Sequence, residues 1–182
     1  SHLFLARKIW NTDAMKVEEV PRYLNQVKYH LRTGLSSEPN RTDLLETLVD
    51  LLMATGEYDD VVRLATPRLE TWPTGYYYLA RIAFKRGDKI NQEIFASFIV
   101  NRYDSLSDVS GLSPEDRERY LLCLALSGYW SRAEPLINQW IGGLDGIKAI
   151  NFWKNRFLAI KAIGMIDMEP EEYDPIVKEL IF

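Results

Sequence analysis

Apolar residues recur at helical spacing along most of the chain, and glycines separate one apolar stripe from the next. Between Thr42 and Pro73 the apolar positions lie three or four residues apart on both sides of Gly56, as on one face of an α-helix. Glycine can leave a helix through a positive φ, which other residues adopt only with strain. The stretch therefore predicts two helices joined by a turn, a unit of roughly thirty-odd residues of the kind that stacks into solenoids.

The order of helix, glycine and helix recurs further along the chain. Other segments align at Gly87 and Gly128, and a weaker one centres on Gly164, with spacings of 31, 41 and 36 residues between the four glycines. Expected helices cover residues 3–10, 17–31, 42–54, 58–71, 76–86, 90–103, 114–127, 129–141, 147–163 and 169–181. No segment alternates apolar and polar residues with a period of two, so we expect an all-α fold of about nine or ten helices and no sheet.

Several residues predict where individual helices begin and end. Ser113 followed by Pro114 is typical of a helix start, and Thr42 is expected to cap the helix that follows it. Gly34 is expected to lie just past the end of the helix over 17–31. Pro67 falls inside the helix expected over 58–71 and should make it irregular or kinked.

The first and third glycine segments resemble the tetratricopeptide repeat family. Units of that family carry a glycine between their helices, an aromatic residue two positions later and a small residue three positions beyond. Gly56 with Tyr58 supplies the first two positions, and Gly128 with Trp130 and Ala133 supplies all three. Further positions match the packing residues of the first helix and the terminal proline: Leu45, Leu48, Leu52 and Pro73.

The resemblance covers roughly residues 42–145 and has clear departures. Val49 and Leu121 stand where the family usually has a small residue, Val61 stands for the usual alanine, and Gln92 breaks the second repeat. The likeness is therefore to a helix-pair solenoid in general rather than to one subfamily.

The resemblance implies a right-handed α-solenoid of antiparallel helix pairs forming a single domain over residues 1–182. Within it we expect N-terminal helices in 3–35, the clearest repeats in 42–145 and a C-terminal helix pair in 147–182. Ser1 and His2 are expected to be a cloning remnant. Both ends of the sequence are apolar, at residues 3–5 and 180–182. These ends either fold back onto the core, or are covered by self-association or a partner, or mark truncation from a longer protein.

The resemblance also implies a concave groove lined by the first helix of each pair. The candidate partner-binding residues in this groove are Asp43, Glu46, Asp50, Tyr77, Arg81, Phe84, Glu118 and Lys154. An acidic and aromatic groove would suit a basic or amphipathic peptide, and the alternative is an ordinary solvated helix face. Glu46 and Asp50 stand where the family's carboxylate clamp has Lys and Asn, which argues against binding of heat-shock chaperones.

Composition and charge narrow the classes of partner. The chain is 47% hydrophobic and 26% charged, with a net charge of −4, which is typical of a folded globular protein. A mildly acidic chain without a basic block argues against nucleic acid and anionic membrane surfaces as partners. No apolar run reaches the roughly 18 residues of a membrane span, so no membrane insertion is expected.

Residues for catalysis, cofactor binding or metal binding are not expected. Nucleophile-elbow, phosphate-loop, dinucleotide and zinc-protease patterns are absent, and the only histidines are His2 and His30. The single cysteine, Cys123, lies in an apolar run and is expected to be a buried hydrophobe. It permits no internal disulfide and favours a reducing compartment such as the cytoplasm.

These observations predict a non-catalytic scaffold, adaptor or assembly subunit that binds a peptide or helix of a partner protein. One alternative is a structural subunit that self-assembles into a homo-oligomer through its apolar ends. Another is a docking or regulatory domain of a larger enzyme.

Overall fold

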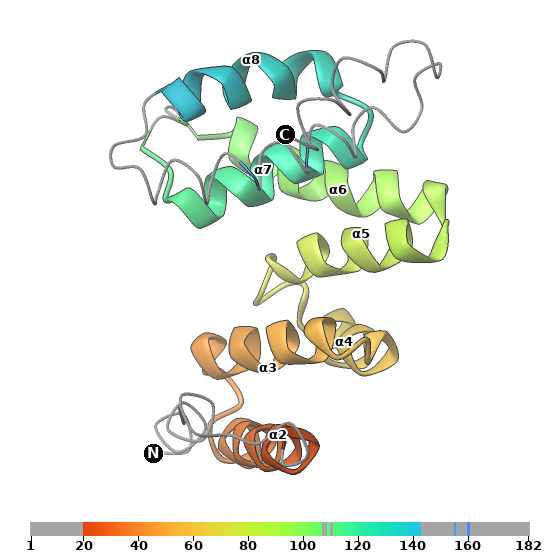
Figure 1. The fold of residues 1–182 in the computed structure, drawn as a ribbon, viewed down its shortest axis with the longest axis vertical. Helices are drawn as coiled ribbons and strands as arrows, with labels where there is room; N and C mark the ends of the chain where they lie inside the picture. The colour runs from red at the N-terminus through yellow and green to blue at the C-terminus, as the bar shows by residue number, and fades with distance from the viewer. Residues whose placement is uncertain (1–19, 107–108, 110, 143–154, 156–159, 161–182) are drawn as a thin grey trace. The chain divides into compact units, whose positions relative to one another are not determined.

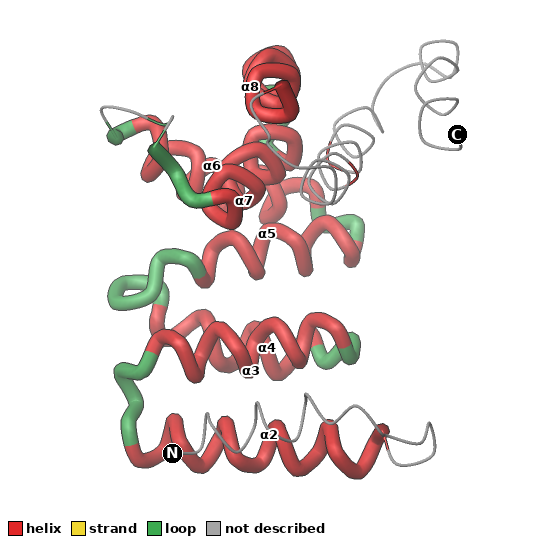
Figure 2. Tube along the Cα trace, turned by 60° about the vertical axis from the view of Figure 1, so that its left-hand side comes forward, coloured by secondary structure: helices red, strands yellow, loops and turns green. Residues whose placement is uncertain are grey.

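All regular structure in the described part of the chain is helical. The computed structural model describes residues 20–106, 109, 111–142, 155 and 160, and no strand occurs among them (Figure 2). The helices are α2 (Val20–Ser37), α3 (Thr42–Ala54), α4 (Tyr58–Ala65), the 3-10 turn η2 (Thr66–Arg68), α5 (Gly75–Arg86), α6 (Lys89–Asp104), α7 (Pro114–Leu126) and α8 (Trp130–Gly142) (Figure 1). The all-α prediction is confirmed for these residues.

Some predictions fall outside the described residues. These are the helix over 3–10, both apolar ends, Gly164 and the helix over 169–181. Within the range 147–163 only Asn155 and Ile160 are described, and both are helical.

The chain divides into two compact units. The N-terminal unit covers Ser1–Arg68 and the C-terminal unit covers Leu69–Phe182. In the N-terminal unit α2 packs against α3, and α3 packs against α4. In the C-terminal unit α5 packs against α6, α6 against α7 and α7 against α8, and α5 also contacts α7.

One type of turn joins the helices of each pair. Gly56, Gly87 and Gly128 have φ values of 76°, 69° and 79°, and they are the described residues with positive φ. After each glycine the next residue donates its N–H to the carbonyl five positions back: Glu57 to Leu52, Asp88 to Ala83 and Tyr129 to Leu124, at 2.9, 2.9 and 2.8 Å. Each glycine N–H bonds to the carbonyl three positions back. This is the Schellman arrangement of a helix end, so the three predicted glycine turns are confirmed.

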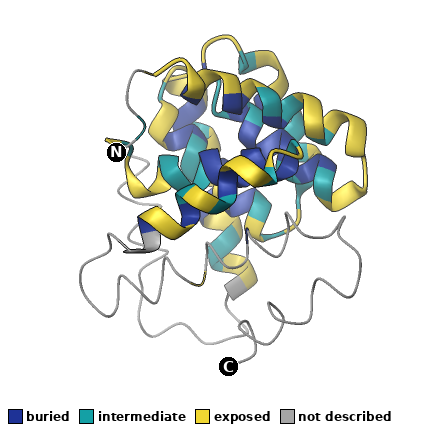
Figure 3. Ribbon diagram, turned by 90° about the horizontal axis from the view of Figure 1, so that it is seen from above, coloured by how far each residue is buried: buried dark blue, intermediate teal, exposed yellow. Residues whose placement is uncertain are grey.

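Each unit buries apolar faces of its own helices. Individual helices carry both buried and exposed positions (Figure 3). Val49 and Leu121, the two large residues at positions where the tetratricopeptide pattern has small ones, are both 0% exposed. Cys123 is also fully buried, as expected. Val49 and Leu121 are therefore core residues. Burial of one aliphatic side chain of this size contributes about 1.5–3 kcal/mol to the free energy of unfolding.

The predicted end of the first described helix before Gly34 is wrong. Helix α2 continues to Ser37, and Gly34 lies inside it, where its carbonyl accepts the Glu38 N–H at 2.8 Å. Leu31 and Leu35, one turn apart, are 0% and 7% exposed, so the buried face runs past the glycine. Burial of Leu35 offsets the ~0.5–1 kcal/mol by which an interior glycine weakens a helix.

The helix expected over 58–71 is also shorter than predicted. Helix α4 ends at Ala65, and Pro67 lies in the 3-10 turn that follows. Proline has no N–H to donate, and its ring clashes with the carbonyl four residues earlier. Pro67 therefore ends the helix rather than kinking it.

The two predicted helix starts have different outcomes. Ser113 caps α7 by accepting the Asp116 N–H at 3.1 Å, and Pro114 is the first helical residue, as predicted. Thr42 is not a cap, because it is itself the first residue of α3 and Arg41 occupies the capping position. The Arg41 guanidinium instead bonds to the two carboxylate oxygens of Asp43 at 2.7 and 2.6 Å.

Gln92, which breaks the repeat pattern, ties α6 to the end of α7. Its side-chain Nε2 donates to the Leu126 carbonyl at 2.7 Å. Leu126 is the last residue of α7, and carbonyls at a helix end have no partner within the helix. The amide therefore satisfies a carbonyl that an alanine at position 92 would leave free.

Two tyrosine–aspartate hydrogen bonds also link α6 to α7. Tyr103 on α6 donates to Asp116 on α7 at 2.7 Å, and Tyr120 on α7 donates to Asp104 on α6 at 2.6 Å. Arg132 on α8 also bonds to Asp104, at 2.7 Å. Burial acts to raise the pKa of Asp104, but the hydrogen bonds from Arg132 and Tyr120 hold it below its ordinary value. Together these hydrogen bonds fix the register of α6, α7 and α8.

Candidate functional site

The predicted groove residues of the N-terminal unit lie together on α3. Asp43, Glu46 and Asp50 are three and four residues apart, so they share one face of the helix. Asp43 and Asp50 are exposed and Glu46 is half-buried. Hydrogen bonds from Arg41 lower the pKa of Asp43 to about 2. Asp43 is therefore held ionised in its pair with Arg41.

The predicted groove residues of the C-terminal unit come from two helices. Tyr77, Arg81 and Phe84 lie on α5, and Glu118 lies on α7. Arg81, Phe84 and Glu118 are half-buried, whereas Tyr77 is only 6% exposed. Lys154 lies outside the described residues.

Tyr77 is covered by arginines rather than open to a ligand. The Arg81 guanidinium carbon lies 5.2 Å from the centre of the Tyr77 ring, and that of Arg119, on α7, lies 5.9 Å from it. Arg81 Nη1 also donates to the Tyr77 hydroxyl at 3.4 Å. Burial raises the pKa of Tyr77 to about 12, although the charge of Arg81 opposes the shift. Tyr77 therefore lies in the packing between α5 and α7, and the Arg81 guanidinium covers its ring.

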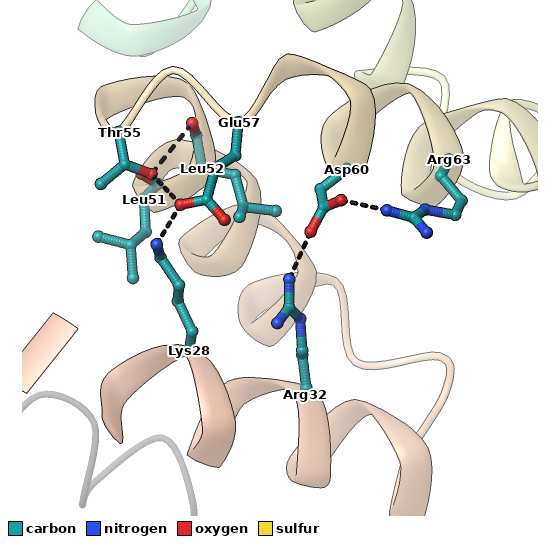
Figure 4. Close-up of polar contacts among 8 residues, drawn as sticks. All are labelled: Lys28, Arg32, Leu51, Leu52, Thr55, Glu57, Asp60 and Arg63. Atoms are coloured by element: carbon teal, nitrogen blue, oxygen red, sulfur yellow. Dashed lines mark hydrogen bonds and ion pairs between the residues drawn. The ribbon is translucent and has the colours of Figure 1, made fainter. Parts of the chain in front are cut away.

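A second group of charged residues, not predicted from the sequence, joins α2 to α4. Lys28 on α2 pairs with Glu57, just before α4, and Arg32 Nη2 on α2 bonds to Asp60 Oδ2 on α4 at 2.5 Å (Figure 4). Asp60 also accepts from Arg63. The two cations are one turn apart on α2 and the two acids are three residues apart, so both pairs form in one register.

Glu57 accepts hydrogen bonds from two side chains, one on α2 and one at the end of α3. It accepts from Lys28, whose side chain is 10% exposed, and from the Thr55 hydroxyl at 2.7 Å (Figure 4). The hydrogen bond from Lys28, followed by that from Thr55, lowers the pKa of Glu57. This pair therefore ties α2 to the start of α4.

Asp60 lies in an open depression next to this pair. The depression has a volume of about 290 Å³ and is lined by Arg32, Asp60, Arg63 and Leu64. The side chains of Arg32 and Arg63 are 49% and 75% exposed, and that of Asp60 is 26% exposed. In the sequence, Lys28 and Arg32 are four residues apart on one expected helix, and Glu57 and Asp60 lie at the start of another, but this spacing does not show that the two sets meet. Acids at the start of a helix are also explained by their favourable interaction with the helix dipole, so their position does not by itself indicate an ion pair.

Comparison with known proteins gives no match to a protein-family model, a curated protein or a solved structure. The described residues contain no group of three or more His, Cys, Asp or Glu side chains that could hold a metal ion. In the same part of the chain, no helix has the length and apolar character needed to span a membrane.

Proposed function

We propose that this chain is a tetratricopeptide-like helical scaffold, without catalytic activity, that binds a peptide or helix of a partner protein. The observation that carries the proposal is the turn repeated at Gly56, Gly87 and Gly128, with the same hydrogen bonds each time. The contact of α5 with α7 adds support, because the first helices of neighbouring pairs meet in such stacks. Stacked helix pairs present extended surfaces, and these are used mainly to bind other proteins.

The acidic face of α3 is the part of the scaffold that we propose for binding. Asp43, Glu46 and Asp50 lie on one side of the helix. Asp43 is paired with Arg41, so the acidic character that complements a basic or amphipathic peptide comes from Glu46 and Asp50. In the C-terminal unit, taken by itself, Arg81 and Phe84 on α5 are the residues that we propose for partner binding.

A displayed peptide library selected against the purified protein tests this function. We expect enrichment of basic or amphipathic sequences. The double variant Glu46→Lys/Asp50→Lys should weaken their binding at least about tenfold, because reversed charges repel the same ligand. Glu93→Lys, at an exposed position on α6, is the control and should bind as the wild type does. Failure to enrich any peptide, or equal binding by all three proteins, would count against the proposal.

A second candidate function, self-assembly, is favoured by an exposed apolar stripe on α6. Ile90, Ile94 and Phe98 follow one another at intervals of four residues and are 74%, 47% and 51% exposed. Tyr76 on α5 stacks on Phe98 with ring centres 4.3 Å apart. Exposed apolar patches on folded proteins often mark interaction sites, and a second copy of the protein would cover this one.

Ile94→Glu/Phe98→Glu should abolish concentration-dependent dimerisation, because two carboxylates would be buried in the new interface. Sedimentation velocity over a concentration series from about 1 μM to 1 mM would measure it. Asn138→Glu/Gln139→Glu, exposed on α8, adds the same charge and should behave as the wild type does. A wild-type protein that stays monomeric over the whole range would rule this function out.

A further inference from the structure

The depression between α2 and α4 carries more positive than negative charge. Its lining residues include two guanidinium groups, from Arg32 and Arg63, and one carboxylate, from Asp60. Asp60 bonds to both arginines, one through each carboxylate oxygen. One positive charge among the four lining residues is therefore not balanced within the depression.

The two arginines also retain donors. Each guanidinium has five N–H groups, and the contacts with Asp60 engage one nitrogen of each. With side chains 49% and 75% exposed, both forks remain accessible from solvent. Because Asp60 holds them on either side of itself, the forks are positioned before a ligand arrives, which reduces the entropy lost on binding.

The size and charge of the depression suit a single carboxylate. A guanidinium fork binds a planar carboxylate through two parallel hydrogen bonds. A ligand with one negative charge balances the surplus, whereas a doubly charged phosphate would exceed it beside Asp60. The volume of about 290 Å³ is at the lower limit of pockets that enclose whole small molecules, about 300–1,000 Å³. Leu64 gives an apolar wall for the carbons that carry the carboxylate.

We propose that the depression lined by Arg32, Asp60, Arg63 and Leu64 binds a carboxylate of a partner peptide, from an acidic side group or from a free C-terminus. The inference rests on the proposed function in one respect, because the carboxylate belongs to a protein partner. It adds to that function a second contact of opposite charge to the acidic face of α3. A partner that combines a basic segment with a carboxylate would satisfy both.

Nuclear magnetic resonance of the arginine side chains tests the site directly. The ¹⁵N-labelled protein is titrated with three N-acetylated tetrapeptides: one amidated with a central Glu, one amidated with Gln in its place, and one with the Gln and a free C-terminus. We expect the Nε signals of Arg32 and Arg63 to shift with the first or third peptide, at roughly millimolar Kd, and not with the second. The peptide that shifts them identifies the source of the carboxylate.

Variants and an anion control decide between outcomes. Arg63→Gln should weaken carboxylate binding at least about fivefold. Arg41→Gln removes another acid-paired arginine of the same unit and should leave binding unchanged. Equal shifts with the neutral peptide, no loss in Arg63→Gln, or tighter binding of inorganic phosphate than of either carboxylate peptide would overturn the inference. If library peptides still bind the α3 face while no carboxylate shifts the arginines, this inference fails and the proposed function stands. If a carboxylate shifts the arginine signals but no library peptide binds, the carboxylate site stands and the proposed scaffold function fails.

Discussion

Leu121→Ala is expected to lower the free energy of unfolding of the C-terminal unit by about 2–5 kcal/mol. Leu121 is 0% exposed on α7, and α7 packs against α5, α6 and α8. Removing its side-chain carbons loses their burial and leaves a cavity that the surrounding helices fill only in part. The tetratricopeptide pattern has a small residue here, so a protein that followed the pattern closely would tolerate the change.

Urea denaturation followed by circular dichroism at 222 nm measures the effect. Leu106→Ala is the matched control, since the same atoms are removed from a side chain that is 46% exposed, and it should change the stability by less than about 0.5 kcal/mol. A loss of under about 1 kcal/mol for Leu121→Ala would show that the side chain is less tightly packed in solution than its burial on α7 implies.

Raising the pH from 10 to 12 is expected to destabilise the C-terminal unit, with Tyr77 alone contributing about 2 kcal/mol. Burial raises the pKa of Tyr77 from 10.0 to about 12 in the folded protein, and a tenfold change in the ionisation constant corresponds to about 1.4 kcal/mol. The neutral hydroxyl is favoured by folding, so this contribution is fully present below pH 10. It is lost as the pH rises through the folded-state pKa.

Tyr77→Phe isolates this contribution. The variant has no hydroxyl to ionise at position 77, so its stability should fall less between pH 10 and 12 than that of the wild type. Tyr129→Phe, at a position 46% exposed in the same unit, should follow the wild type. Parallel stability curves for Tyr77→Phe and the wild type would contradict the assignment. Absorbance at 295 nm, which reports tyrosinate, gives an independent measure of the titration.

The three glycine turns were predictable because the information is local. A positive φ is available to glycine without strain, and the apolar stripes on either side of Gly56 and Gly128 give the helix direction. Gly34 shows the limit of the same rule. The residues next to Gly34 do not show whether the helix ends there. The helix continues because Leu35 is buried, and the burial of Leu35 depends on the packing of α3 against α2.

Contacts between distant residues were not predictable from one sequence. Arg32 and Asp60 are 28 positions apart, and the Gln92 side chain bonds to a carbonyl 34 positions away. Tyr77 was assigned to a groove by its place on a first helix, but its neighbour Arg119 comes from α7. Helical periodicity gives the face of one helix and not the identity of what covers that face. The ion pairs of the depression therefore emerged only from the way α2, α3 and α4 pack together.

The glycine turns also have a consequence for how the protein acquires its structure during synthesis. Each turn joins helices that are consecutive in the sequence, and α6 and α7 are likewise consecutive partners. Proteins dominated by such short-range contacts fold in microseconds to milliseconds, because little chain entropy is lost before the first contacts form. Translation proceeds at only about 5–20 residues per second. Each helix pair can therefore form soon after its second helix leaves the ribosome. This limits the time for which its apolar face is exposed and able to aggregate.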